Sequence, residues 1–195
     1  MSAPIIETNK WQSSSYDMII DVRSPAEFFN DHIPDAVNMP VLSDSERDIV
    51  GTIYKQQSSF NARKYGAVLV ARNIAEQLEK KLHLMTTDFK PLIHCWRGGQ
   101  RSRAFAQICS EIGWKTFILK GGYKSYRRDV LIGLEEISDK LKFVVIAGRT
   151  GSGKTGILHE LINSGSQVLD LEKLAAHRDS LLGAVVNCMQ PSQRL

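Results

Sequence analysis

A cysteine, two arginines and two glycines lie close together at residues 92–102, which read LIHCWRGGQRS. Cys95 follows an apolar run that predicts a strand, and parallel α/β sheets bind ligands at the carboxyl ends of their strands. Gly98 and Gly99 let the backbone curl so that its N–H groups point inward, and SRAFAQIC is expected to form the next helix. These N–H groups would lower the pKa of the thiol and hold an anion. We therefore interpret Cys95 as a nucleophile.

The loop after the cysteine supplies the candidate ligands for that anion. We assign the anion-binding loop to Trp96, Arg97, Gly98, Gly99, Gln100 and Arg101. An arginine can bind a phosphate group through two parallel N–H donors. His94 and Cys95, followed after five intervening residues by Arg101 and a serine, also match the pattern of cysteine phosphatases, so phosphate-ester hydrolysis is one reading. Cys109 has helical spacing among apolar residues and is expected only to pack.

A second motif, GRTGSGKT, matches a phosphate-binding loop at every defined position. It comprises Gly148, Arg149, Thr150, Gly151, Ser152, Gly153, Lys154 and Thr155. Its N–H groups would bind a di- or triphosphate, Lys154 would lie along the terminal phosphates, and the Thr155 hydroxyl could bind Mg²⁺. Asp170 is a candidate acidic partner for that metal, although capping of the following helix explains it nearly as well. No tightly bound cofactor is expected.

The distribution of charge indicates anionic partners. The formal net charge is +4, and residues 95–128 contain eight basic residues but one acidic residue. Residues 50–73 add four basic and three aromatic residues without an acid, a mixture suited to phosphates and unstacked bases. Ordinary solvated helix surfaces would explain either stretch equally well.

Composition and length are those of a soluble globular protein. The 195 residues are 43% hydrophobic and 24% charged, and no apolar run approaches the roughly 18 residues that span a bilayer. Without a recognisable signal peptide, we expect a cytoplasmic protein with no membrane segment. Three cysteines without metal-ligand spacing favour reduced thiols over disulfides. The sequence is compatible with a monomer and with an oligomer of unknown size.

Apolar runs alternate with helical stretches, which predicts an α/β protein with a mostly parallel sheet. Capping boxes mark helix starts after Ser24 and Ser43. Strands are expected in the runs MIIDV, AVNMP, PLIHC, TFILKGG, FVVIAG and QVLDL. We place one domain at residues 1–135 and a partial phosphate-loop domain at residues 136–195, joined by a connecting helix.

The motifs together resemble a known family. Residues 21–40, DVRSPAEFFNDHIPDAVNMP, resemble the signature of rhodanese domains, a fold that sulfurtransferases share with one phosphatase family. A rhodanese-like domain followed by a phosphate loop, with the strings CWRGGQRS, GGYKSYRR, GRTGSGKT, VLDLEKLAAHR and QPSQ, resembles bacterial tRNA 2-selenouridine synthases over nearly the whole chain.

The resemblance implies a tRNA-modifying selenotransferase. Such an enzyme replaces the sulfur of wobble 2-thiouridine by selenium from selenophosphate, through an S-geranyl-2-thiouridine made from geranyl diphosphate. Cys95 would be essential, its loop would hold selenophosphate and the phosphate loop would hold geranyl diphosphate. Lys124, Arg127 and Arg128 would contact tRNA. The alternatives are a cysteine phosphatase, a simple rhodanese sulfurtransferase, and a non-catalytic nucleotide- or RNA-binding module.

Two features depart from that family. Asp179 stands where the family pattern HRGS has glycine, and a side chain there could impair a phosphate site. The 54 residues after Leu141 are too few for a complete phosphate-loop domain, so we expect a truncated chain.

Overall fold

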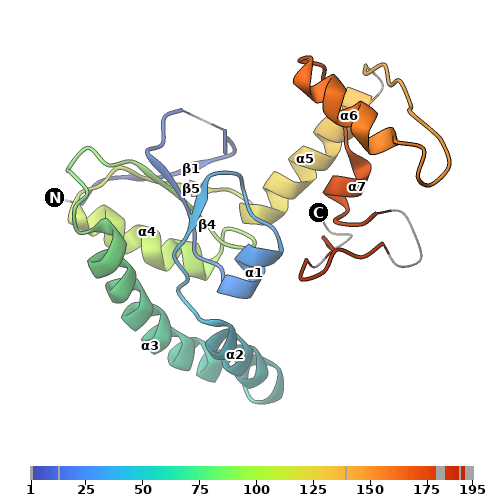
Figure 1. Cartoon of the computed structure of the whole chain (residues 1–195). Helices are drawn as coiled ribbons and strands as arrows, with labels where there is room; N and C mark the ends of the chain where they lie inside the picture. The colour runs from blue at the N-terminus through green and yellow to red at the C-terminus, as the bar shows by residue number, and fades with distance from the viewer. Residues whose placement is uncertain (1, 13, 139, 179–182, 189, 192–195) are drawn as a thin grey trace. The chain divides into compact units, whose positions relative to one another are not determined.

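The computed structural model describes residues 2–12, 14–138, 140–178, 183–188 and 190–191 (Figure 1). Backbone contacts divide the chain into two compact units, Met1–Ile137 and Ser138–Leu195. The domain boundary placed at residue 135 stays a prediction.

The first unit is built on a five-stranded sheet in which every paired strand is parallel. Its strands are β1 (Ile5–Thr8), β2 (Met18–Asp21), β3 (Ala36–Asn38), β4 (Pro91–His94) and β5 (Thr116–Leu119). The order across the sheet is β1-β5-β4-β2-β3. Cys95 therefore follows the central strand, and all four residues of that strand are buried.

Helices cover both faces of this sheet. They are α1 (Pro25–Asn30), α2 (Asp44–Gln56), α3 (Ser59–Gln77), the π-helical turn η1 (Leu78–Leu82), α4 (Gln100–Ile112) and α5 (Gly122–Ser138). Side chains from α3, η1 and α4, such as Ile74, Leu82 and Phe105, form one buried cluster with the sheet. Tyr123 and Tyr126 of α5 belong to a second cluster. The predicted parallel α/β architecture is confirmed.

The strand β1 was not expected from the sequence. It pairs with β5 at the edge of the sheet, and its burial alternates between exposed and half-buried positions. Such an edge strand carries little hydrophobic signal, because one side of it faces solvent.

The second unit departs from the predicted strands. It contains α6 (Lys154–Asn163) and α7 (Leu171–Leu174), whereas residues 143–148 and 167–170 form no strand. The expectation of a strand at residues 143–148 was therefore wrong, and Phe143, Val144 and Val145 are 62%, 93% and 82% exposed. A strand needs a neighbour for its N–H and C=O groups, and the described part of this unit offers none.

In the part of the chain that the structure describes, no helix combines the length and the apolar character needed to cross a membrane.

Candidate active site

The cysteine loop joins β4 to α4 and encloses the sulfur of Cys95. The Gly99 N–H donates to Sγ at 3.2 Å, and Ser102 Oγ lies 3.4 Å from the same sulfur. Gly99 is also the N-cap of α4 and has no side chain to accept from the first-turn N–H groups. The first-turn N–H groups of α4 therefore have no side-chain cap, and they can donate to an anion beside the sulfur.

The surroundings of Cys95 favour its ionised form. Burial would raise the pKa of this thiol, since Cys95 is 3% exposed. Hydrogen bonds from the Ser102 side chain and backbone, the charge of Arg101 and the Arg97 N–H together outweigh burial, so the pKa lies below its ordinary value. For Cys109, burial outweighs a backbone hydrogen bond and raises the pKa to about 12. Its expected packing role agrees with its place in the core.

Arg101 is fixed beside the loop by a carboxylate from α1. Its Nη1 lies 2.8 Å from Glu27 Oε2, and Arg47 Nε reaches the same oxygen at 3.1 Å. Glu27 also accepts from the Ser24 N–H at 3.2 Å, because Glu27 is the third helical residue of the capping box and its carboxylate reaches back to the N-cap Ser24. Of the other predicted ligands, Arg97 and Gln100 are exposed.

A second loop braces the cysteine loop from the side. The N–H groups of Tyr123 and Lys124 donate to the carbonyl oxygens of Cys95 and Trp96 at 2.9 and 3.0 Å. Gly122 has a φ of 59°, and a Cβ at this position would overlap the Cys95 carbonyl oxygen and lie 2.6 Å from the Gly98 nitrogen. The loop shape therefore depends on Gly122 having no side chain.

The residues predicted to contact tRNA lie on α5, which begins at this second loop. Lys124 is tied to the cysteine loop through its backbone and is exposed. Arg127 lies 4.0 Å from Asp31, and Arg128 pairs with Asp129 at 3.7 Å. The structure thus brings α5 to the loop, with two of the three cations already facing carboxylates.

Buried charges lie beneath the loop. Arg23 is 1% exposed and binds the Asp21 carboxylate, with Nη2 at 2.6 Å from Oδ2. Its guanidinium stacks on the Tyr123 ring at 3.9 Å. His94 is fully buried, its Nε2 lies 3.9 Å from Asp21, and neither ring nitrogen has a hydrogen-bond partner among the described residues. Burial is the largest cause that lowers the pKa of His94 to about 4, so its ring is neutral near pH 7.

The phosphate loop has the glycine conformations that its motif requires. Gly151 and Gly153 have φ values of 81° and 78°, and Gly153 caps α6. Lys154 Nζ donates to the carbonyl oxygens of Gly148 and Arg149 at 2.9 and 3.1 Å. Thr155 is exposed in the first turn of α6.

Asp170 caps the helix that follows it, which confirms the alternative interpretation of this residue. Its Oδ1 accepts from the Lys173 N–H at 3.0 Å at the start of α7. Its role towards a metal stays a prediction. Asp179 lies outside the described residues.

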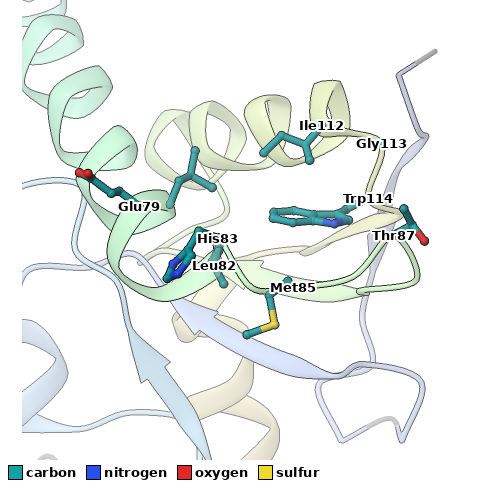
Figure 2. A pocket seen from close by; sticks show the side chains of 9 residues that line it. Glu79, Leu82, His83, Met85, Thr87, Ile112, Gly113 and Trp114 are labelled. Atoms are coloured by element: carbon teal, nitrogen blue, oxygen red, sulfur yellow. The ribbon is translucent and has the colours of Figure 1, made fainter.

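A hollow of about 480 Å³ lies away from this chemistry (Figure 2). The Trp114 ring lies between Ile112 at the end of α4 and the segment that carries Met85. Trp114 precedes β5 and Met85 precedes β4, so the hollow is at the amino ends of the parallel strands. Cys95 is at their carboxyl ends, on the opposite edge of the sheet.

Sequence reasoning missed several residues that build the site. Ser102 was part of the cysteine-phosphatase pattern, and its position directly after Arg101 was the available signal. Gly122 could have been found from the glycine pair that follows β5. Glu27 and the buried Asp21 gave no such signal, because only the fold brings α1 and β2 to the cysteine loop.

Two family models match the chain. Residues 5–129 match the rhodanese-like domain, and residues 141–195 match the tRNA 2-selenouridine synthase AAA domain.

Similar proteins over most of the chain are named tRNA 2-selenouridine synthase. The chain is 40% identical over 90% of its length to a tRNA 2-selenouridine synthase of Nitrosomonas europaea. It is 39% identical over 85% of its length to one of Sulfurovum sp. strain NBC37-1. These matches cover 45% and 44% of the two relatives, so the chain spans less than half of their length. The resemblance drawn from the sequence motifs is confirmed.

A solved structure supports the fold of the first unit. The N-terminal domain of a putative ATP/GTP binding protein from Clostridium difficile 630 aligns with a TM-score of 0.57 and 34% identity. The alignment covers 66% of this chain and 99% of that domain.

Proposed function

Because the chain belongs to the rhodanese-like domain family through residues 5–129, we propose that it supplies the nucleophilic cysteine of a tRNA 2-selenouridine synthase. The reaction would replace the sulfur of wobble 2-thiouridine in tRNA by selenium. The observation that carries this proposal is the Cys95 sulfur, which is held by the Gly99 N–H and Ser102 at the start of α4. The adjoining match to the tRNA 2-selenouridine synthase AAA domain supports it.

In this proposal the two anion sites serve two phosphate-bearing substrates. Selenophosphate would bind the exposed Arg97 and the α4 N–H groups, with Arg101 held near them by Glu27. Geranyl diphosphate would bind the phosphate loop, where Gly151 and Gly153 let backbone N–H groups approach a diphosphate. When bound there, Mg²⁺ would neutralise diphosphate charge beside Thr155.

Cys95 would act as a thiolate on the activated carbon of S-geranyl-2-thiouridine. Its sulfur would bond to that carbon as geranyl thiol leaves, and selenium from selenophosphate would then displace the Cys95 sulfur. A thiolate is the reactive form of cysteine, and the hydrogen bonds to this sulfur, together with the charge of Arg101, lower the pKa of the thiol. His94 is neutral near pH 7, so the thiolate is stabilised by hydrogen bonds and by Arg101 and not by a charged imidazole.

The test is nucleoside mass spectrometry of 2-thiouridine-containing tRNA after incubation with selenophosphate and geranyl diphosphate. The chain is compared with its Cys95→Ser variant, and the longer Nitrosomonas europaea relative serves as the positive control. We expect selenated nucleoside from the chain, and none from the variant. Product from the relative but none from the chain would contradict the proposal for this chain.

One observation favours a second candidate, a cysteine phosphatase. Arg101 and Ser102 stand beside the Cys95 sulfur, as the cysteine-phosphatase pattern requires. That candidate requires release of inorganic phosphate from an aryl phosphate, lost in Cys95→Ser. If the chain released phosphate faster than it modified tRNA, hydrolysis would be favoured as its function.

A further inference from the structure

The helical hairpin formed by α2 and α3 ends in a surface that the proposed chemistry does not use. Helix α2 ends at Gln56 and α3 begins at Ser59, so two residues connect them. The aromatic and basic residues among the last six positions of α2 and the first six positions of α3 are here called the α2–α3 tip. Its members are Tyr54, Lys55, Phe60, Arg63 and Lys64.

The aromatic residues of the α2–α3 tip face solvent. Tyr54 is 62% exposed and Phe60 is 64% exposed. Helix α3 packs through Ala62, Gly66 and Leu69, which are buried at helical spacing, so Phe60 lies off its inner face. These rings are therefore available to a partner outside the chain.

The three cations of the α2–α3 tip, Lys55, Arg63 and Lys64, are also exposed to solvent. Phe60, Arg63 and Lys64 are spaced at i, i+3 and i+4 and share one face of α3. Within the described part of the chain, none of the three tip cations forms an ion pair or a side-chain hydrogen bond. No acidic residue occurs between Asp48 and Glu76. The tip is a positive surface with two exposed rings.

At the other end of the same hairpin, charged side chains pair with groups of the hairpin itself. There Arg72 pairs with Glu46, and Asn73 Nδ2 donates to the same carboxylate at 2.7 Å. The hairpin is thus polarised along its length, with its acidic groups and paired charges at one end and unpaired cations with rings at the other.

We propose that the α2–α3 tip binds single-stranded RNA. Its chemistry fits that ligand, because exposed rings stack on unpaired bases while lysine and arginine contact the phosphates between them. An apolar protein partner would leave the three cations without counter-charges. The choice of RNA over other single strands rests on the proposed function, in which an unpaired loop of tRNA is the substrate.

The experiment measures binding of the 195-residue chain to a fluorescent single-stranded oligoribonucleotide, to the matching duplex and to tRNA. Replacing both rings, Tyr54→Leu with Phe60→Leu, should weaken single-strand binding roughly tenfold, since stacking contributes substantially per base. Duplex binding should change far less, because paired bases cannot stack on the rings. The control is Phe29→Leu, which removes a ring that is 79% exposed elsewhere and should leave both affinities unchanged.

Neutralising the cations tests the phosphate contacts. Lys55→Gln, Arg63→Gln and Lys64→Gln together should weaken binding of every RNA and lower the log-log salt slope by about 2, at roughly 0.7 per single-strand phosphate. The matched control is Lys10→Gln with Lys90→Gln. Far-UV circular dichroism of each variant checks that the hairpin still folds.

The outcomes separate this inference from the proposed function. RNA binding that survives both sets of substitutions overturns the tip as an RNA surface and leaves the proposed function standing. Failure of the chain to bind any of the three RNAs contradicts both. Loss of self-association instead, seen by analytical ultracentrifugation, would assign the tip to a protein contact and overturn the inference.

Discussion

At the scale of single residues, two buried cysteines show how hydrogen bonds decide the charge of a thiol. Cys95 and Cys109 are 3% and 0% exposed, so burial opposes ionisation of both. Around Cys95, donors from Gly99 and Ser102 and the charge of Arg101 reverse that effect. For Cys109, burial outweighs a backbone hydrogen bond, and the pKa rises to about 12. Reactivity should therefore be confined to Cys95 within the core.

Ser102 should be a positioning residue for the Cys95 thiolate. Ser102→Ala removes the hydroxyl that lies 3.4 Å from the sulfur and can donate to the thiolate, and one such hydrogen bond is worth about 1 kcal/mol, or somewhat less than one pKa unit. We expect the pH midpoint of Cys95 alkylation by iodoacetamide to rise by roughly that amount. The control is Ser110→Ala on the same helix, whose hydroxyl bonds Ala3 instead. Equal midpoints in the two variants would remove Ser102 from this role.

His94 should make stability depend on pH. Its pKa of about 4 in the folded chain lies below the 6.5 of a free histidine, so between these values the unfolded chain binds more protons. Stability from this group is full above pH 6.5 and is lost as the pH falls towards 4, by roughly 3 kcal/mol in all.

The measurement for His94 is urea unfolding between pH 4 and 7. Tryptophan fluorescence reports on the first unit, since Trp11, Trp96 and Trp114 all lie there. His94→Leu should flatten the pH dependence, and His83→Gln, at an exposed position, is the control for loss of one histidine. A slope that persists in His94→Leu would assign it to other groups.

At the scale of elements, the turn into α5 determines the shape of the cysteine loop. Gly122 contacts the backbone of that loop, and its positive φ disfavours any side chain. Gly122→Ala should cost about 2–4 kcal/mol through backbone strain and overlap, and should slow alkylation of Cys95. Gly133→Ala, in the same helix with open space around it, should be neutral or slightly stabilising. Comparable losses in both variants would show a general effect of α5 instead.

Residues 143–148 should exchange their amide hydrogens rapidly. They form no strand, and three of their apolar side chains are more than half exposed. The buried strand β4 should exchange slowly under the same conditions. Hydrogen exchange read by mass spectrometry compares the two segments, and equal protection would mean that residues 143–148 are paired after all.

The sequence predicted those elements whose signals are local. Capping residues marked the starts of α1 and α2, and apolar runs marked β2 to β5. The run FVVIAG had the same local signal but forms no strand, because pairing depends on a neighbouring strand rather than on composition. The edge strand β1 lacks such a signal but still forms, because β5 lies beside it and pairs with it.

At the scale of the whole molecule, the candidate site combines segments that are far apart in the sequence. The motif alone identified Cys95 and its loop, since a strand end, two glycines and a helix start are contiguous. Glu27 lies 74 residues before Arg101, and their contact follows only from the order of strands in the sheet. Such contacts cannot be predicted from spacing, because they depend on how α1 and α4 meet around β2 and β4.

The proposed chemistry depends on the claim that the cysteine loop lowers the pKa of the Cys95 thiol. Its most direct test is a pH titration of thiolate ultraviolet absorbance in the chain, with the Cys95→Ser signal subtracted so that Cys109 and Cys188 cancel. We predict a midpoint below the ordinary cysteine value of 9.0, because the hydrogen bonds and Arg101 outweigh burial. A midpoint at or above that value would contradict the claim that this loop prepares a nucleophile.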